Sequence, residues 1–184
     1  MKIRIADIPL EGKEIDFELD KDIINQRVRL VAEEAGPKTA KPFDYLFNEN
    51  PKVKLRLEMD GSTVVVSGRL ESGFSTQCCR CLEDAKTEIN IPIEIILKPI
   101  SGRIPAKEQE DDIKFGTYNG EEVECNNFCE DYLFLALPFT VYCSTTCKGL
   151  CPLCGTNLNA ATCECKKEET GDPRMSIFRQ LKIH

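Results

Sequence analysis

The sequence predicts an α+β protein, with an antiparallel β-rich body, a few helices and a small C-terminal zinc-binding module. Two observations support this prediction. In the first hundred residues, apolar and polar side chains alternate over several segments, as in strands with one buried face. Residues 143–165 then contain six cysteines, a density typical of a metal-binding module. We therefore expect a body over residues 1–140, and a cysteine-rich module with a C-terminal helix over residues 141–184.

The strands are predicted from alternation alone. It is present over residues 2–5, 14–20, 53–66 and 89–95. The clearest case is 53–66, where an alternating run over 53–59 is followed by Asp60-Gly61 and then by Thr63-Val64-Val65-Val66. Asp60-Gly61 supplies the positive φ angles of a tight hairpin turn. Pro92 interrupts the last run and indicates an edge or a bulge, because proline donates no ladder hydrogen bond.

The helix predictions differ in how clearly the sequence supports them. Residues 21–34 fit a helical stripe and also a strand, so this pattern leaves both possibilities open. Residues 126–137 follow a helical pattern that Pro138 ends. Residues 101–112 are acidic and are expected to form a solvated connector. The chain closes with a short amphipathic helix after Asp172-Pro173-Arg174, with apolar positions Ile177, Phe178, Leu181 and Ile183.

The cysteines of the C-terminal module have the spacing of a zinc site. Cys151-Pro-Leu-Cys154 is followed by glycine, an arrangement that turns two sulfurs toward one ion. The only histidine is the terminal His184, so a Cys₂His₂ finger is close to excluded and a structural all-thiolate site is expected. We predict four zinc ligands, with two alternates: Cys147, Cys151, Cys154 and Cys165, then Cys143 and Cys163.

Composition argues against the competing classes of protein. The N-terminal residues contain no apolar secretion segment, and eleven cysteines is an odd number, so an extracellular disulfide framework is disfavoured. A cytoplasmic location follows as the expectation. The longest apolar run is too short to span a bilayer, so no membrane segment is expected. The net charge of −7 argues against broad attraction to nucleic acid and leaves only local basic patches for RNA contact.

A second cysteine motif, Cys78-Cys79-Arg80-Cys81, has redox or metal spacing. The simplest interpretation is that Cys78 and Cys81 are buried structural cysteines. A second metal site completed by Cys125 and Cys129 is an alternative. Thiol-disulfide chemistry is a weaker one, because the pair follows a predicted strand rather than starting a helix and the chain offers no internal histidine as a base.

Five motifs in fixed order carry a family resemblance. They are the Cys-x-Arg-Cys-Leu of Cys78–Leu82, the helix end Leu133–Pro138, the Cys-Lys-Gly-Leu-Cys-Pro-x-Cys-Gly-x-Asn-Leu-Asn of Cys147–Asn159, Cys163-Glu-Cys165 and Asp172-Pro173-Arg174. Together they resemble the YceD family, the large ribosomal RNA subunit accumulation proteins. Family members with histidine in place of Cys163 and Cys165 support a ligand there, because cysteine and histidine both bind zinc.

The resemblance implies a non-catalytic ribosome biogenesis factor that supports accumulation or processing of large-subunit (23S) rRNA and 50S assembly. Its implied partners are that rRNA or its precursor, or 50S ribosomal proteins, with no small-molecule substrate. A zinc-ribbon adaptor without RNA contact and a redox protein using Cys78 and Cys81 remain alternatives. The candidate RNA or partner contacts are basic residues that could equally be solvated charges: Arg80, Lys148, Lys166, Lys167, Arg174 and Arg179.

Overall fold

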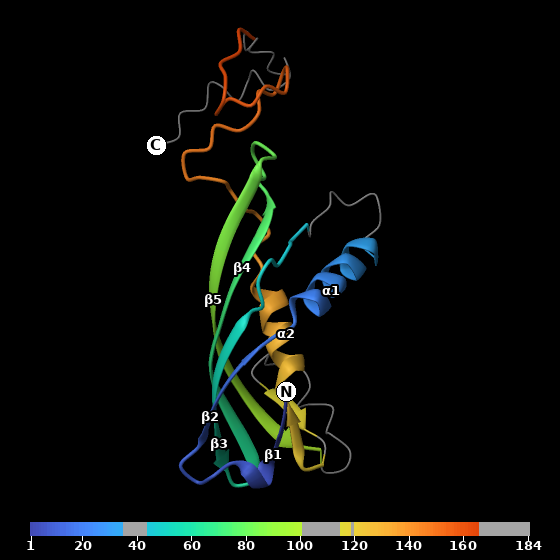
Figure 1. Ribbon diagram of the computed structural model, residues 1–184, viewed down its shortest axis with the longest axis vertical. Helices are drawn as coiled ribbons and strands as arrows, with labels where there is room; N and C mark the ends of the chain where they lie inside the picture. The colour runs from blue at the N-terminus through green and yellow to red at the C-terminus, as the bar shows by residue number, and fades with distance from the viewer. Residues whose placement is uncertain (35–43, 101–114, 119, 166–184) are drawn as a thin grey trace, which may run out of the picture.

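The computed structural model describes residues 1–34, 44–100, 115–118 and 120–165 (Figure 1). They form the predicted α+β class, with a mostly antiparallel sheet and two helices. A five-stranded sheet has the order β2-β3-β4-β5-β6, and β1 pairs with β7 in a separate two-stranded sheet. The elements are β1 (Lys2–Arg4), a 3₁₀ turn (Ile5–Asp7), β2 (Lys13–Glu18), α1 (Lys21–Glu34), β3 (Lys52–Asp60), β4 (Thr63–Gln77), β5 (Asp84–Pro99), β6 (Phe115–Tyr118), β7 (Glu122–Glu124) and α2 (Cys125–Ala136).

The β4–β5 hairpin is the longest feature of the sheet and positions the candidate site. Its antiparallel register runs from Val64 opposite Leu97 to Gln77 opposite Asp84. The pairing of β3 with β4 ends at Glu71, so the part of the β4–β5 hairpin from Ser72 to its tip continues beyond the end of β3. In Figure 1 this free part of the hairpin extends away from the sheet and reaches the C-terminal segment of the chain.

The core lies between one face of the sheet and α2. Along β3, β4 and β5 the side chains alternate between buried and exposed, as the sequence pattern predicts. Leu57 and Ile93 are fully buried from the sheet, and Leu133 is fully buried from α2. Each such side chain stabilises the fold by about 1.5–3 kcal/mol relative to exposure. Neither helix in the described part of the chain is long and apolar enough to cross a membrane.

Several element predictions are confirmed. The predicted hairpin is present, but its turn is Gly61-Ser62, one residue later than predicted, because Asp60 still pairs with Thr63. Of the predicted turn residues Gly61 has a positive φ, +61°, and Asp60 does not. Pro92 pairs with Arg69 of β4 in a part of β5 that has no strand on its other side among the described residues. The second predicted helix is α2, which ends at Ala136 before Pro138. The acidic connector 101–112 and the C-terminal helix lie outside the described residues.

The ambiguous segment 21–34 is helical. In α1, Ile24 and Val28 lie one turn apart and are both buried, whereas Leu30, which a strand would have placed with Val28, is 52% exposed. Arg27 fixes the helix to α2, because its guanidinium donates to the carboxylate of Asp131 at 2.7 Å.

Gly68 is required where β3 and β4 approach closely. A Cβ at this position would lie 2.1 Å from the carbonyl oxygen of Lys54. Because that oxygen belongs to the backbone, the strand itself would have to shift to relieve the clash. We expect Gly68→Ala to lower the free energy of unfolding by about 2 kcal/mol or more. Gly73→Ala is the matched control in the same strand, because the nearest atom to its Cβ is 3.9 Å away. Equal denaturation midpoints for the two variants would contradict this explanation.

Candidate metal centres

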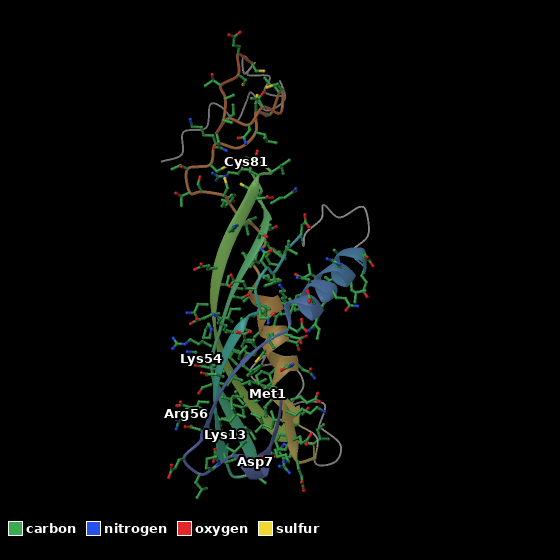
Figure 2. The ribbon with its side chains drawn as sticks, viewed as in Figure 1. Met1, Asp7, Lys13, Lys54, Arg56 and Cys81 are labelled. Atoms are coloured by element: carbon green, nitrogen blue, oxygen red, sulfur yellow. The ribbon has the colours of Figure 1, made fainter. Side chains whose placement is uncertain are left out.

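The structure brings eight cysteines into two groups of four. In each group the four sulfur atoms all lie within 4.8 Å of one another. The first, which we call the hairpin-tip cluster, joins the end of the β4–β5 hairpin to the chain that follows α2, and Figure 2 labels its Cys81 at the end of the hairpin. The second, the C-terminal cluster, is formed within the last described segment. Their members are Cys78, Cys81, Cys143 and Cys147, then Cys151, Cys154, Cys163 and Cys165.

The sulfur separations fit a shared tetrahedral ion. The Sγ atoms of Cys78 and Cys147 are 3.8 Å apart, and those of Cys81 and Cys143 are 3.5 Å apart. A disulfide bond would require about 2.05 Å. Four sulfurs placed tetrahedrally at about 2.3 Å from zinc lie about 3.8 Å from one another. The cysteines of the hairpin-tip cluster therefore fit an ion of the size and coordination of Zn²⁺.

A tight turn at the end of the hairpin presents Cys78 and Cys81. The backbone N–H of Cys78 donates to the carbonyl of Glu83 at 2.8 Å, and that of Leu82 donates back to the carbonyl of Cys78 at 3.0 Å. Leu82, directly after the second cysteine, has a left-handed backbone with φ +62°. The N–H of Arg80 points at Cys78 Sγ, 3.4 Å away, and thereby supports a thiolate.

The C-terminal cluster repeats this turn. The N–H of Gly155 donates to the carbonyl of Cys151 at 2.9 Å, and Gly155 has φ +74°. The residue after the second cysteine is thus left-handed in both turns, with glycine here in the position of Leu82. Cys154 Sγ lies 3.2 Å from the hydroxyl oxygen of Thr156. This geometry predicts that both turns present two sulfurs to one ion in the same way.

Hydrogen bonds set which thiols ionise first. Burial opposes ionisation of Cys78, but backbone N–H groups, with those of Cys143 and Arg80 foremost, lower its pKa to about 6. The hydroxyl of Thr156 is the main cause that lowers the pKa of Cys154 to about 6. A hydrogen bond between the side chains of Cys165 and Cys154, followed by burial and by repulsion between the two thiolates, raises the pKa of Cys165 to about 12. A divalent cation would relieve that repulsion and release the remaining protons.

The predicted ligand set is not the set that the structure groups together. Cys151, Cys154 and Cys165 share a cluster, but their fourth member is the alternate Cys163. Cys147 instead joins the hairpin-tip cluster together with the other alternate, Cys143. The physical reason is the position of the hairpin: its tip supplies two sulfurs, and the first two cysteines after α2, Cys143 and Cys147, lie beside it. Sequence reasoning could have found this by pairing Cys143-x-x-x-Cys147 with Cys78-x-x-Cys81 as two half-sites.

Cys125 and Cys129 do not complete a site with Cys78 and Cys81. Both lie on α2 and are fully buried in the core, and neither belongs to a cluster in the described part of the chain. Burial raises the pKa of Cys125 to about 11 and raises that of Cys129 as well. These two residues are inert packing thiols, whereas Cys78 and Cys81 are buried and are members of a possible metal site.

Of the candidate contact residues, the structure describes two. The guanidinium of Arg80 lies over the ring of Tyr142, 4.5 Å from its centroid, and donates from Nη1 to the carbonyl of Cys147 at 3.1 Å. Lys148 is exposed, and its backbone N–H donates to Asn159 Oδ1 at 2.8 Å. The other four candidates, Lys166, Lys167, Arg174 and Arg179, lie outside the described residues.

The predicted boundary at residue 140 falls between the two halves of the hairpin-tip cluster. Backbone hydrogen bonds cross it as well, from Cys79 N–H to the carbonyl of Val141 at 2.9 Å and from Leu150 N–H to the carbonyl of Arg80 at 3.0 Å. Gly149 permits the second approach, because a Cβ there would lie 3.1 Å from that carbonyl oxygen. The first residues of the predicted module are therefore anchored to the hairpin.

The fold and the site define a small α+β protein with two four-cysteine clusters whose geometry is compatible with metal binding. The chain belongs to the YceD family, described as large ribosomal RNA subunit accumulation protein YceD, whose match covers residues 66–182. This region contains all eight cysteines of the two clusters. The resemblance noted in the sequence is confirmed.

Curated relatives agree with this assignment. A protein of Mycobacterium tuberculosis (strain ATCC 25618 / H37Rv), described only as uncharacterized, is 31% identical over 128 residues, which are 69% of this chain and 59% of that protein. The chloroplastic large ribosomal RNA subunit accumulation protein YCED homolog 1 of Arabidopsis thaliana is 37% identical over 49 residues, 27% of this chain and 15% of that protein. The chain thus spans under two thirds of the length of these relatives. No solved structure matches it.

Thiol labelling tests the clusters directly. In metal-loaded protein at pH 8 we expect iodoacetamide to modify Cys79 first, because it is exposed and lies outside both clusters. The raised pKa of Cys125 keeps it protonated at this pH, so it and Cys129 should react only after unfolding. Chelation should expose the eight cluster thiols. Mass spectrometry after timed labelling measures this order, and rapid loss of cluster thiols before chelation would contradict it.

Gly149 and Gly155 provide a matched pair for testing the anchor. Both have a left-handed backbone, with φ +77° and +74°, but a Cβ at Gly155 meets nothing within 4 Å. Each alanine variant should lose about 1 kcal/mol from backbone strain. Gly149→Ala should lose more and should release metal faster, because its Cβ also presses on the carbonyl of Arg80. Thermal denaturation and metal release would show this difference, and equal losses would refute the steric contribution.

Proposed function

We propose that the protein is a non-catalytic, cytoplasmic ribosome biogenesis factor that supports accumulation or processing of 23S rRNA and assembly of the 50S subunit. One observation carries the proposal: the family match includes the hairpin tip and both four-cysteine clusters. The family description names large-subunit rRNA accumulation. The clusters supply the rigid surface through which such a factor would act.

Zinc in both clusters would be structural. Four thiolates fill a tetrahedral coordination sphere and leave no position for a substrate or a reactive water. Its contribution would be to hold the hairpin tip and the C-terminal segment in one arrangement. The residues that would bind it are Cys78, Cys81, Cys143 and Cys147 in the hairpin-tip cluster, and Cys151, Cys154, Cys163 and Cys165 in the C-terminal cluster.

Charge at the hairpin tip favours a second candidate, an adaptor that contacts ribosomal proteins rather than rRNA. A Zn²⁺ ion with four thiolates has a net charge of about −2, and there are two such clusters. Arg80 and Lys148 offset only part of this charge. Apolar side chains are also exposed on the two turns, Leu82 at 58% and Leu153 at 62%. Such a surface suits a basic protein segment better than a phosphate backbone.

A thiol-disulfide enzyme is the least supported alternative. Cys78 has a lowered pKa, as a nucleophile would require. Its sulfur, however, lies in a group of four with Cys147 3.8 Å away, and its turn follows a strand rather than starting a helix. The chain also has no internal histidine to serve as a base. A metal-binding role explains all four thiols, whereas redox chemistry uses only two.

Complementation of a deletion strain tests the proposal. Loss of the protein should lower 23S rRNA relative to 16S rRNA and reduce the 50S peak in sucrose gradients. Arg80→Ala should restore less than wild type, because it removes both the stack on Tyr142 and the hydrogen bond to Cys147. Lys148→Ala removes an exposed cation without those contacts and is the matched control. Unchanged rRNA ratios in the deletion strain would defeat the ribosomal function.

Affinity purification separates the two forms of the proposal. Crosslinked 23S rRNA recovered with the tagged protein, and lost at raised salt, supports direct RNA contact. Recovery of 50S proteins that survives nuclease treatment supports the adaptor. Zinc content must be measured in each variant, so that a lost metal is not mistaken for a lost contact. If neither rRNA nor 50S proteins are enriched over an unrelated tagged protein, both forms fail.

A further inference from the structure

Asn159 belongs to the C-terminal segment but contacts a sulfur of the hairpin-tip cluster. Its side-chain Nδ2 lies 3.3 Å from Cys147 Sγ and donates to it. Its Oδ1 accepts the backbone N–H of Lys148 at 2.8 Å, which fixes the orientation of the amide. In sequence, Asn159 lies between Cys154 and Cys163, two members of the other cluster. One amide thus links the loop of the C-terminal cluster to a ligand of the hairpin-tip cluster.

Four further hydrogen bonds hold Asn159 and its neighbours in place. Asn157 Oδ1 accepts hydrogen bonds from the backbone N–H and from Nδ2 of Asn159, both at 3.0 Å. Asn157 in turn donates from Nδ2 to Glu83 of the hairpin turn at 3.2 Å. The N–H of Leu158 donates to the carbonyl of Gly149 at 2.9 Å. The loop that the C-terminal cluster closes is therefore attached to both chains that supply the hairpin-tip cluster.

The two clusters differ in exposure. Three members of the hairpin-tip cluster are buried, and Cys143 alone is exposed. In the C-terminal cluster only Cys151 is buried, whereas Cys154 and Cys165 are exposed. A competing chelator or an oxidant will reach the C-terminal cluster first. Two routes connect that metal to the hairpin tip: the backbone between Cys147 and Cys151, and the loop that holds Asn159.

We propose that Asn159 couples the two metal sites, so that occupancy of the C-terminal cluster stabilises metal in the hairpin-tip cluster. A hydrogen bond from a fixed amide orients the sulfur of Cys147, as outer-shell donors do in other metal sites. When the C-terminal cluster loses its metal, the loop loses the crosslink that positions this amide. The proposal rests on the zinc occupancy in the proposed function. It adds the order in which zinc is released: first from the C-terminal cluster, then from the hairpin-tip cluster.

Chelator competition on the full-length, zinc-loaded protein tests the coupling. Wild type should release zinc in two phases, the faster from the C-terminal cluster. Asn159→Asp keeps an acceptor for Lys148 N–H but replaces the sulfur donor with a carboxylate, so it should accelerate the slow phase about tenfold or more. Asn159→Ala should act in the same direction. Asn127→Ala is the control, because this exposed α2 residue contacts Glu124, far from either cluster in sequence.

A double-mutant comparison separates coupling from a general loss of structure. Cys154→Ser with Cys163→Ser removes the C-terminal site and should also accelerate release from the hairpin tip. Adding Asn159→Asp to that protein should change the rate little further, because the amide is already free. Cobalt substitution checks that the remaining site is still tetrahedral. Additive effects, or an Asn159→Asp rate equal to that of Asn127→Ala, would overturn the coupling. Absence of bound zinc in wild type would instead refute the metal proposal itself.

Discussion

The convergence of four sulfurs at the hairpin tip is the constraint on which the rest of the site depends. Cys81 and Cys143 are separated by 62 positions, yet their Sγ atoms are 3.5 Å apart. Between them the chain completes β5, β6, β7 and α2. A crosslink over a loop of this length removes much conformational freedom from the unfolded chain, which is how long-range disulfides are held to stabilise proteins. A metal bound there would act in the same way.

This crosslink compensates for a weakness in the sheet. Among the described residues, β4 beyond Glu71 pairs with β5 alone, apart from an isolated bridge between Leu46 and Ser75. A two-stranded ribbon without a third strand is marginally stable in water. Cys78 and Cys81 lie at its end, and the N–H of Cys79 is bonded to Val141. Phe74 still packs on the rings of Tyr45 and Phe47, with centroids 5.1 and 5.8 Å away. Beyond it, the cysteine cluster and the returning chain stabilise the end of the hairpin.

The sequence was sufficient for strands in the first hundred residues, but not for the short strands β6 and β7 or for the partition of the cysteines. Alternation identified the first strand of the 53–66 hairpin, because its buried residues, such as Leu57, have polar neighbours on both sides. Residues 21–34 satisfied two periodicities, and only packing against the core decided between them. Cysteine spacing identifies half-sites, but which half-sites meet depends on tertiary structure. Cys147 and Cys151 are consecutive cysteines only four positions apart, yet they belong to different clusters because the hairpin lies beside only Cys147.

The same geometry gives Arg80 two possible roles that sequence alone does not separate. Its guanidinium is exposed, which suits contact with a partner, but it also stacks on Tyr142 and bonds to the carbonyl of Cys147. Because Cys147 is a member of the hairpin-tip cluster, a partner that binds Arg80 in this orientation leaves the contact with the cluster in place. Conversely, a loaded cluster presents Arg80 in one direction, which lowers the entropy lost on binding. Metal occupancy and partner affinity at the hairpin tip are therefore expected to rise and fall together.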